Sequence, residues 1–453
     1  MVPTQPTTAV RTLPPMIISQ DGRPAMKPYA QQSTRELEAA YQGLMEEYRS
    51  WQQRGLQLDM SRGKPDAHQL SFADAMLDTV TSASGARSQS GVDCRNYGCP
   101  DGLPEVRQMM ADMLEVAPDE IILGGNSSLN MMFDAISRAM TQGVYGSDKP
   151  WCREPELKFL CPAPGYDRHF AITQHFGIQM IPVEMTPQGP NMDQVEEYVR
   201  DPAVKGIWCV PKYSNPTGAV YSPETVDRLA RLRPGARDFR IFWDNAYCVH
   251  NIYEEDVPLA NLFARLKEQG SGDMIFLFGS TSKISYAGGG VAAIAGSRNN
   301  MQLIRQQMAI QTIGYDKISQ LMHARFFRDL DGIKEHMKLH AAAIRPKFQL
   351  VDRILTQELE GLDIARWTKP KGGYFISFDA LDQCAQRIVA LCKEAGVVTT
   401  PAGATYPYGV DPNDRNIRIA PTFPSMEELE EATRLFCLCT KLASVEYYLT
   451  ISR

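Results

Sequence analysis

The chain has 453 residues, with 47 Lys plus Arg against 53 Asp plus Glu, and its formal net charge is −6. Its composition, 43% hydrophobic and 22% charged, is typical of a globular protein with two or three domains and excludes a disordered or fibrous one. The acidic balance argues against nucleic acid or an anionic membrane as the main partner, and no apolar run reaches the ~18 residues that a membrane span needs.

Residues 1–33 are rich in Pro, Thr and Gln and contain no apolar segment of the kind that a signal peptide needs. We expect them to form a mobile arm, or one that lies over a neighbouring subunit. A helix is predicted to start near Thr34, which with Glu38 offers a cap and early acidic charge. A short alternating strand at 56–60 follows and leads into the sequence SRGKP at 61–65.

From about residue 105 to 330, helical stretches alternate with short apolar runs. These runs lie at 121–125, 158–162, 178–184, 206–211, 241–247 and 274–280. Strands interleaved with helices at this spacing predict an α/β domain with a mainly parallel sheet that is buried on both faces.

The pattern changes after a long charged helical region at about 316–360. Three strand-like runs and a last helix follow, at 372–381, 396–402, 416–421 and from about 425. They predict a smaller α+β unit, which the strand near Leu56 could join. The chain is therefore divided into an arm, an N-terminal part of a small domain, a large domain and a C-terminal part of the small domain, at 1–33, 34–66, 67–330 and 331–453.

Polar residues follow four of the predicted strands, where ligands bind in open parallel sheets. Gly124, Gly125, Asn126, Ser127 and Ser128 follow the first run and precede a helical stretch. Their backbone amides and hydroxyls can bind a phosphate at the start of that helix, although Gly-Asn-Ser is also ordinary turn chemistry. Polar segments follow three further runs, at 212–218, 244–247 and 281–283.

Two charged residues stand at the ends of very apolar strands. Asp244 follows IFW, and a buried carboxylate is costly unless a cationic partner compensates it. Lys283 follows MIFLFGSTS and precedes a segment with three glycines. Each alone could be a strand-end residue that reaches solvent. Together with the phosphate-binding segment and an Asn-Pro turn in the same sheet, they indicate a functional site.

The ten cysteines are scattered, form no CxxC pair and lie mostly in apolar segments, so we expect buried reduced thiols in a cytoplasmic enzyme. His336 and His340 stand four residues apart, as in a zinc-binding helix. The glutamate of HExxH is missing and nothing nearby completes a site, so we predict no metal and place both histidines on a solvated helix face.

In this arrangement the sequence resembles the fold-type I aminotransferases, which depend on pyridoxal phosphate, and within them the aspartate aminotransferase-like subgroup with SRGKP near its start. The resemblance covers about residues 56 to 425. It is carried by SRGKP, RNYGCPDG, GGNSS, PAPGYDRH, SNPTG, DNAY, STSK and RIAP, at 61–65, 95–102, 124–128, 162–169, 214–218, 244–247, 280–283 and 418–421. It implies a large cofactor domain, a small domain assembled from both ends of the chain, and a homodimer with shared active sites.

The resemblance also implies roles for individual residues. Lys283 would hold pyridoxal phosphate as a Schiff base and then move the proton between Cα and the cofactor as general base and acid. Asp244 would pair with the pyridinium nitrogen and keep it protonated, which answers the need for a cationic partner. Asn215 and Tyr247 would hydrogen-bond the phenolic oxygen of the cofactor.

Further residues match the motifs that bind the remaining parts of cofactor and substrate. Tyr166 would stack on the cofactor ring, and Tyr97 would reach the phosphate from the partner subunit. Arg418 would grip the substrate α-carboxylate with its two-pronged guanidinium, beside Asn215 and Gly63. The phosphate would be held by the loop residues Asn126, Ser127 and Ser128 together with Ser280 and Ser282.

One position departs from the family pattern. Many relatives have an arginine eight residues after the lysine to neutralise the phosphate, whereas this chain has Val291, preceded by Gly288, Gly289 and Gly290. The next arginine is Arg298, beyond an apolar run that resembles a strand. Backbone amides of the glycine segment are the alternative that the sequence offers.

The resemblance implies transamination by a ping-pong mechanism (EC 2.6.1.-), with aspartate or glutamate as the favoured amino donor and 2-oxoglutarate as a 2-oxo acid acceptor. A second carboxylate on the substrate needs a cation, and Lys317 and Arg62 are the candidates. Lys317 could instead be a surface charge that follows Asp316 at a helix start, and Arg62 could pack against the opposite domain.

Other functions use the same residues. A pyridoxal-phosphate lyase or decarboxylase differs in stereoelectronics at Cα, and an aminotransferase of a specialised pathway could take aromatic or other non-acidic amino acids. A cofactor-sensing regulator on this fold needs an appended DNA-binding unit, and the residues before Thr34 are too few for a helix-turn-helix domain.

Overall fold

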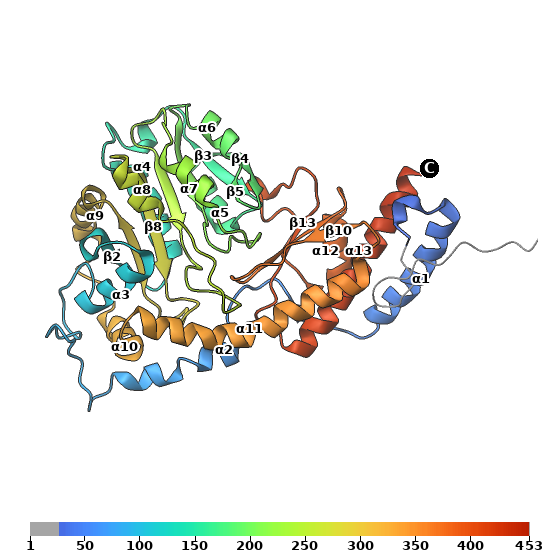
Figure 1. The fold of residues 1–453 in the computed structure, drawn as a ribbon, viewed down its shortest axis with the longest axis horizontal. Helices are drawn as coiled ribbons and strands as arrows, with labels where there is room; N and C mark the ends of the chain where they lie inside the picture. Colours follow the sequence, from blue (N-terminus) through green and yellow to red (C-terminus); the bar gives the residue numbers. More distant parts are fainter. Residues whose placement is uncertain (1–26, 453) are drawn as a thin grey trace, which may run out of the picture.

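The structure is a computed structural model that describes residues 27–452, so most of the predicted arm lies outside the described residues. Two domains lie side by side, and the long helix α11, Leu330–Leu359, runs beneath both of them (Figure 1). Among residues 27–452, no helix is both long and apolar enough to cross a bilayer.

An eight-stranded sheet forms the centre of the large domain, in the order β2-β9-β8-β7-β6-β3-β4-β5. The strands are β2 Ile121–Leu123, β3 Lys158–Ala163, β4 Gln179–Thr186, β5 Gly189–Pro190, β6 Val204–Cys209, β7 Arg240–Asp244, β8 Ile275–Ser280 and β9 Ala292–Gly296. The five strands from β8 to β4 run parallel, and β9, β2 and β5 pair antiparallel at the two edges. The predicted mainly parallel α/β sheet is therefore confirmed.

Helices cover both faces of this sheet (Figure 1), because alternate strand residues point to opposite faces and nearly all of them are apolar. One face packs on α4 Ser128–Gln142, α5 Asp167–His175 and α9 Arg298–Gln311. The other packs on α3 Pro104–Leu114, α6 Met192–Tyr198, α7 Pro223–Ala230, α8 Leu262–Glu268 and α10 Lys317–Phe327. Every residue of β6 and β7 is buried, so polar side chains at their carboxyl ends lie next to a dry core.

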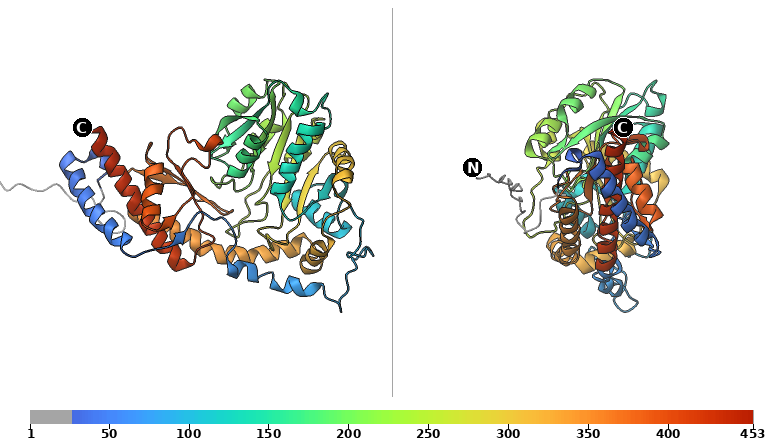
Figure 2. Two further views of the ribbon diagram at one scale, coloured as in Figure 1. Left: turned by 180° about the vertical axis from the view of Figure 1, so that it is seen from behind. Right: turned by 90° about the vertical axis from the view of Figure 1, so that its right-hand side faces the viewer.

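The small domain contains segments from both ends of the chain. An antiparallel sheet in the order β10-β11-β13 consists of Ala365–Trp367, Ile376–Ala380 and Asn416–Ile419. A parallel pair joins β1, Leu58–Asp59, to β12, Val397–Val398. The helices around them are α1 Thr34–Gln52, α2 Ala67–Ser71, α12 Ala385–Glu394 and α13 Met426–Ile451. Helix α1 packs along α13, as Figure 2 shows from behind.

The first helix starts where the sequence predicts, but its cap is different. Ser33, not Thr34, is the N-cap residue: its hydroxyl accepts from the backbone N–H of Glu36, and the Glu36 carboxylate accepts from the backbone N–H of Ser33. Such a capping box requires the acid three residues after the cap, so Glu36 serves and Glu38 does not.

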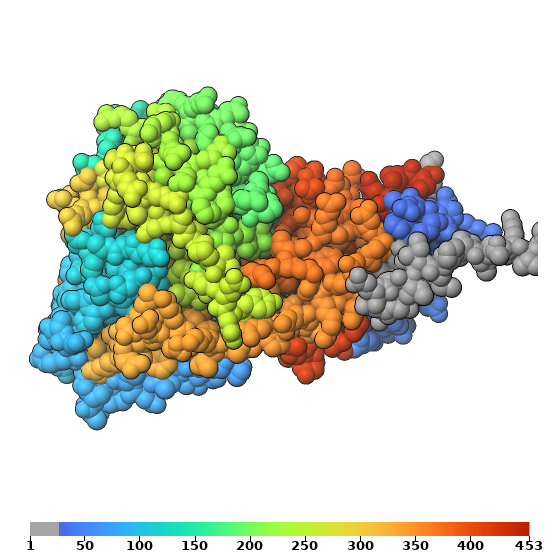
Figure 3. All heavy atoms as spheres, viewed as in Figure 1, coloured from blue at the N-terminus to red at the C-terminus, as the bar shows by residue number. Residues whose placement is uncertain are grey.

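The strand-end loops of the large domain meet the small domain along a broad contact (Figure 3). The backbone of Ile252, in the loop after β7, bonds to Lys371, and Arg345 of α11 donates from Nε to the Ile252 oxygen at 2.8 Å. Asn251 forms a β-bridge with Gly372. These contacts place the segment after β7 at the junction of the two domains.

Candidate active site

Asp244, the last residue of β7, is the buried acid at the centre of the site. It is only 2% exposed, because the strand before it is fully buried. Its Oδ2 atom lies 3.0 Å from Nε2 of His169, whereas its Oδ1 atom has no hydrogen-bond partner among residues 27–452. A buried carboxylate oxygen without a donor is costly, so this atom favours an N–H group supplied by a bound molecule.

His169 is a site residue that the sequence did not indicate. Its ring stacks on the indole of Trp208, with the centroids 4.4 Å and the planes 10° apart. Trp208 donates from Nε1 to Thr173 Oγ1, and Thr173 donates to the backbone oxygen of His169. These contacts fix the imidazole against Asp244. His169 ends the PAPGYDRH motif, but a histidine in a predicted helix does not reveal that it reaches an acid on another element.

Lys283 lies in the loop after β8, with its amine 5.1 Å from the centre of the Tyr247 ring. Burial lowers the pKa of Lys283 from its ordinary value, while the negative charge of Asp244 acts in the opposite direction. A lowered pKa increases the fraction of neutral amine, which is the nucleophilic form. Burial raises the pKa of Tyr247 well above its ordinary value, so its phenol stays protonated and can donate a hydrogen bond.

Tyr166, Asn215 and Arg418 lie around the same place. Burial is the main cause of the raised pKa of Tyr247; the negative charge of Asp244 raises it further, and the positive charge of Arg418 lowers it. The Tyr166 ring stands edge-on to the ring of His169, with centroids 4.9 Å apart. Asn215 is 3% exposed, and its Oδ1 atom accepts from Nη1 of Arg418 at 3.3 Å. The structure thus brings together residues from three strand ends and the small domain.

The predicted phosphate-binding residues also meet. Ser282 donates to the backbone oxygen of Asn126 at 2.9 Å, and Ser280 donates to Ser282 at 3.1 Å. Ser127 is the N-cap of α4 but its hydroxyl makes no capping bond, and Ser128 is the first helical residue. Two hydroxyls and the free N–H groups of the first turn of α4 are therefore available to an anion at this helix start.

The position of the missing arginine is closed to a ligand. Val291 is 1% exposed and packs in the core of the large domain. Its backbone N–H donates to Thr281 Oγ1 at 2.9 Å. Arg298 does not replace the arginine, because it stands at the start of α9 and pairs with Asp119 at 2.7 Å.

Arg418 of β13 is held from several sides. Its guanidinium lies over the ring of Phe375, with 4.7 Å from Cζ to the ring centroid. Nη1 lies 2.9 Å from Oδ1 of Asp167, and Nε donates to Thr400 at 3.4 Å. Gly63 packs directly against the Phe375 ring, so closely that a Cβ atom at position 63 would collide with it. A glycine in SRGKP is therefore needed for the Phe375 platform to form.

Three other predicted residues stand at the surface or apart from this cluster. Tyr97 is 80% exposed. The Arg62 side chain is 67% exposed and pairs loosely with Asp59 at 3.6 Å. Lys317 is the first residue of α10 and is only 6% exposed, next to the loop that contains Gly98.

The prediction that His336 and His340 lie on a solvated helix face is wrong. They are 7% and 1% exposed, because α2 and α10 cover this side of α11. His336 contacts the backbone oxygen of Ile284 through Nε2 at 2.9 Å, and His340 contacts the amide of Gln69 through Nδ1 at 3.1 Å. No cluster of His, Cys, Asp and Glu suited to a metal is found among residues 27–452.

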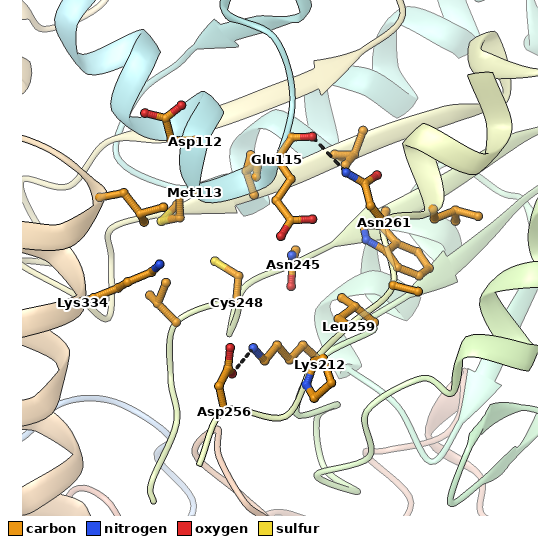
Figure 4. A pocket seen from close by; sticks show the side chains of 18 residues that line it. Asp112, Met113, Glu115, Lys212, Asn245, Cys248, Asp256, Leu259, Asn261 and Lys334 are labelled. Carbon is orange, nitrogen blue, oxygen red and sulfur yellow. Dashed lines mark hydrogen bonds and ion pairs between the residues drawn. The ribbon is translucent and has the colours of Figure 1, made fainter. Parts of the chain in front are cut away.

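A separate cavity of about 240 Å³ opens behind the end of β7. Figure 4 shows Asn245 and Cys248 among its walls, with Lys212 paired to Asp256 at 2.7 Å. Asn245 follows Asp244 directly, and successive residues of an extended chain point to opposite sides. The cavity therefore lies on the other side of the sheet from the cluster around Asp244.

Comparison with known proteins agrees with this geometry. A family model described as aspartate amino-transferase matches residues 30–451. An aspartate aminotransferase from Corynebacterium glutamicum is 43% identical over 87% of this chain and 91% of that protein. The crystal structure of an aspartate transaminase from the same species is similar with a TM-score of 0.91, at 40% identity, over 93% of this chain and 99% of that one.

A more distant structure shares the fold. It is an α-aminoadipate aminotransferase from Thermus thermophilus, crystallised with N-(5′-phosphopyridoxyl)-L-leucine. The TM-score is 0.70 at 19% identity, and the match covers 92% of this chain and 96% of that one.

Proposed function

Because the chain belongs to the aspartate aminotransferase family, we propose that it moves the amino group of an acidic L-amino acid, aspartate or glutamate, to a 2-oxo acid such as 2-oxoglutarate. The observation that carries the proposal is that buried Asp244, with one oxygen unsatisfied among residues 27–452, and Lys283, whose pKa burial lowers, follow the neighbouring strands β7 and β8. This arrangement fits a cofactor that has both a basic ring nitrogen, which the acid can bind, and an aldehyde, with which the amine can react.

That cofactor is pyridoxal 5′-phosphate, which aminotransferases of this family use. The residues present fit it: no donor within residues 27–452 reaches Asp244 Oδ1, Lys283 offers a nucleophilic amine, and the start of α4 offers groups for a phosphate. When bound, pyridoxal phosphate supplies an electron sink that stabilises the negative charge left at Cα when its proton is removed.

The chain's own residues supply the rest of the chemistry. His169 keeps the Asp244 carboxylate in place through Oδ2, and this carboxylate would hold a proton on the ring nitrogen of the cofactor. Tyr247 and Asn215 would donate to its phenolic oxygen, and Tyr166 would cover its ring. Lys283 would attach the cofactor, and its Nζ atom would remove the proton from the substrate Cα.

Arg418 binds the substrate α-carboxylate. Phe375 and Asn215 orient the guanidinium, and Gly63 gives Phe375 its place. The planar guanidinium of arginine donates two parallel hydrogen bonds to a carboxylate. Asn126, Ser127, Ser128, Ser280 and Ser282 bind the phosphate, without an arginine at position 291.

The active form is proposed to be a homodimer in which Tyr97 reaches the phosphate site of the partner. Tyr97, Ile310 and Ile313 are 80%, 89% and 65% exposed. Gly314, next to Ile313, packs against the loop that contains Gly98, so these apolar side chains share one region of the surface. Large apolar side chains gathered on a surface indicate a protein interface.

Mixing two inactive variants tests the shared site. Lys283→Ala and Tyr97→Ala homodimers should each have low activity. After mixing and subunit exchange, hybrid dimers contain one site with both Lys283 and Tyr97 intact, so activity should rise well above that of either parent. Steady-state rates before and after exchange measure this. Unchanged activity in mixtures whose exchange is verified by mass spectrometry would place Tyr97 outside the partner's site.

The distal carboxylate of the substrate needs a cation, for which Arg62 and Lys317 remain the proposed residues. Arg62→Ala or Lys317→Ala should lower kcat/KM for aspartate by about 10- to 100-fold, the effect of losing a charged hydrogen-bonded partner. Activity on an amino acid with a neutral side chain should change little. Rates measured over a panel of amino acids test this and the proposed function together. A wild-type preference for aromatic or aliphatic donors would contradict the acidic-substrate proposal.

A further inference from the structure

The ion pair between Asp167 and Arg418 has no part in the chemistry described so far. Nη1 of Arg418 and Oδ1 of Asp167 lie 2.9 Å apart. Arg418 belongs to β13 of the small domain and Asp167 begins α5 of the large domain, so the pair joins the two domains. The carboxylate of Asp167 is therefore bound to the guanidinium that the substrate α-carboxylate must also bind.

We propose that Asp167 is a built-in competitor for Arg418, which holds the guanidinium until a substrate α-carboxylate displaces it. The proposal rests on the proposed function, in which Arg418 binds that carboxylate. Asp167 then sets how strongly the site binds any carboxylic acid, and so acts on binding affinity rather than on the chemical step.

Arg418 does not need Asp167 for its orientation. The guanidinium lies over Phe375, Nε donates to Thr400, and Nη1 also donates to Asn215. Phe375, Thr400 and Asn215 are all buried. Three fixed contacts on different sides of a planar group define its position, and removal of Asp167 leaves all three in place.

Asp167 can leave the pair at little cost. Its side chain is 35% exposed, whereas that of Arg418 is 10% exposed, so water can solvate the released carboxylate. Asp167 is also the first residue of α5, where the positive end of the helix dipole stabilises a negative charge. Release of Asp167 therefore leaves no buried charge without a partner, because the guanidinium exchanges the Asp167 carboxylate for that of the substrate.

The exchange lowers the affinity of the site for every carboxylic acid by a similar factor, because each acid must first break the ion pair between Asp167 and Arg418. A simple carboxylic acid gains only the bond to Arg418, so little net affinity remains and it binds weakly. A substrate adds contacts through its amino group and its side chain, which outweigh the lost pair. Asp167 therefore raises the concentration at which any acid occupies the site and leaves the ratio of affinities between acids unchanged.

The isosteric variant Asp167→Asn in the cofactor-loaded enzyme tests the proposal, with propionate as a probe that has a carboxylate but no amino group. The dissociation constant of propionate, measured from the visible absorbance of the bound cofactor, should be about three- to tenfold lower in the variant than in the wild type. The reason is that a partly exposed ion pair no longer has to be broken. KM for aspartate and for 2-oxoglutarate should fall by similar factors, while kcat changes less.

Asp193→Asn is the matched control, because Asp193 also lies in the first turn of a helix and pairs with an arginine, Arg228, at 2.6 Å. It should leave propionate binding unchanged. If Asp167→Asn weakens propionate binding, Asp167 orients Arg418 and the proposal is overturned; unchanged binding overturns it as well.

Arg418→Lys separates this proposal from the one on which it rests. It should weaken propionate binding at least ~10-fold in both the wild-type and the Asp167→Asn backgrounds, since a lysine cannot form the two-pronged bond. If Arg418→Lys leaves propionate binding intact, the carboxylate site lies elsewhere and the proposed role of Arg418 fails. If Arg418→Lys weakens binding while Asp167→Asn does not strengthen it, only the competitor proposal fails.

Discussion

Replacement of Lys283 by alanine should abolish transamination and remove the covalently bound cofactor. Lys283 lies near Tyr247, and burial lowers the pKa of the Lys283 amine. A larger fraction of this amine is therefore neutral and available as the nucleophile for attachment. Loss of the nucleophile and of the base that acts at Cα removes two functions at once, and the rate should fall by at least ~10⁴. Borohydride reduction and peptide mapping should find the cofactor on residue 283 in the wild type and on no peptide in the variant.

Lys212 provides the control for this experiment. It also follows a buried strand, is 6% exposed and pairs with Asp256, but it lines the cavity on the other side of the sheet. Lys212→Ala should retain the cofactor on Lys283. A reduced adduct on Lys212, or on any lysine other than Lys283, would contradict the assignment of the whole site.

Asp244→Asn should lower the transamination rate by about 10²–10³, the usual effect of losing a preorganised charge at a reacting centre. An amide cannot hold a proton on the ring nitrogen, and the electron sink weakens. The cofactor-free variant should unfold no earlier than wild type, because the amide oxygen can keep the contact that Oδ2 makes with His169, and Oδ1 has no partner to lose among residues 27–452. Single-turnover rates and thermal unfolding measure the two effects separately.

Asp238, just before β7, shows what a purely structural acid does. It accepts from Lys205, Ser147 and Trp151, and Lys205 holds its pKa below the ordinary value although burial acts in the opposite direction. Asp238→Asn should lower the unfolding temperature while the rate per folded molecule changes little.

Near-normal turnover in Asp244→Asn would show that the acid that protonates the ring is a different residue.

The fold could be predicted from the sequence, and so could the site residues that stand at the ends of strands. Apolar runs interleaved with helices predicted the parallel sheet. Asp244 stands out because it directly follows the apolar residues 241–243, and Lys283 because it stands three residues after the run that ends at Ser280. The expected fold class and family are confirmed by the sheet order and by the relatives. The individual roles in the site are predictions for the experiments above.

Contacts between distant elements could not be predicted in this way. His169 reaches Asp244 from α5, and Asp167 reaches Arg418 across the domain junction. The absence of the HExxH glutamate argues against a metal at His336 and His340 and leaves a solvated helix face as the prediction, yet the side of α11 that carries them is covered by α2 and α10. Which face of a helix is covered depends on tertiary packing, and local pattern does not contain that information.

The pairing of β1 with β12 joins segments that stand far apart in the sequence, Leu58 to Val397 and Asp59 to Val398. During translation α1 and β1 leave the ribosome more than three hundred residues before their partners β12 and α13 exist. Strands β2 to β9 are complete long before that, so the large domain can fold first while the first segment waits with its apolar side chains exposed. A nascent chain that stops after α11 therefore has the lysine but neither Arg418 nor a finished small domain, and is expected to depend on chaperones rather than to act as a partial enzyme.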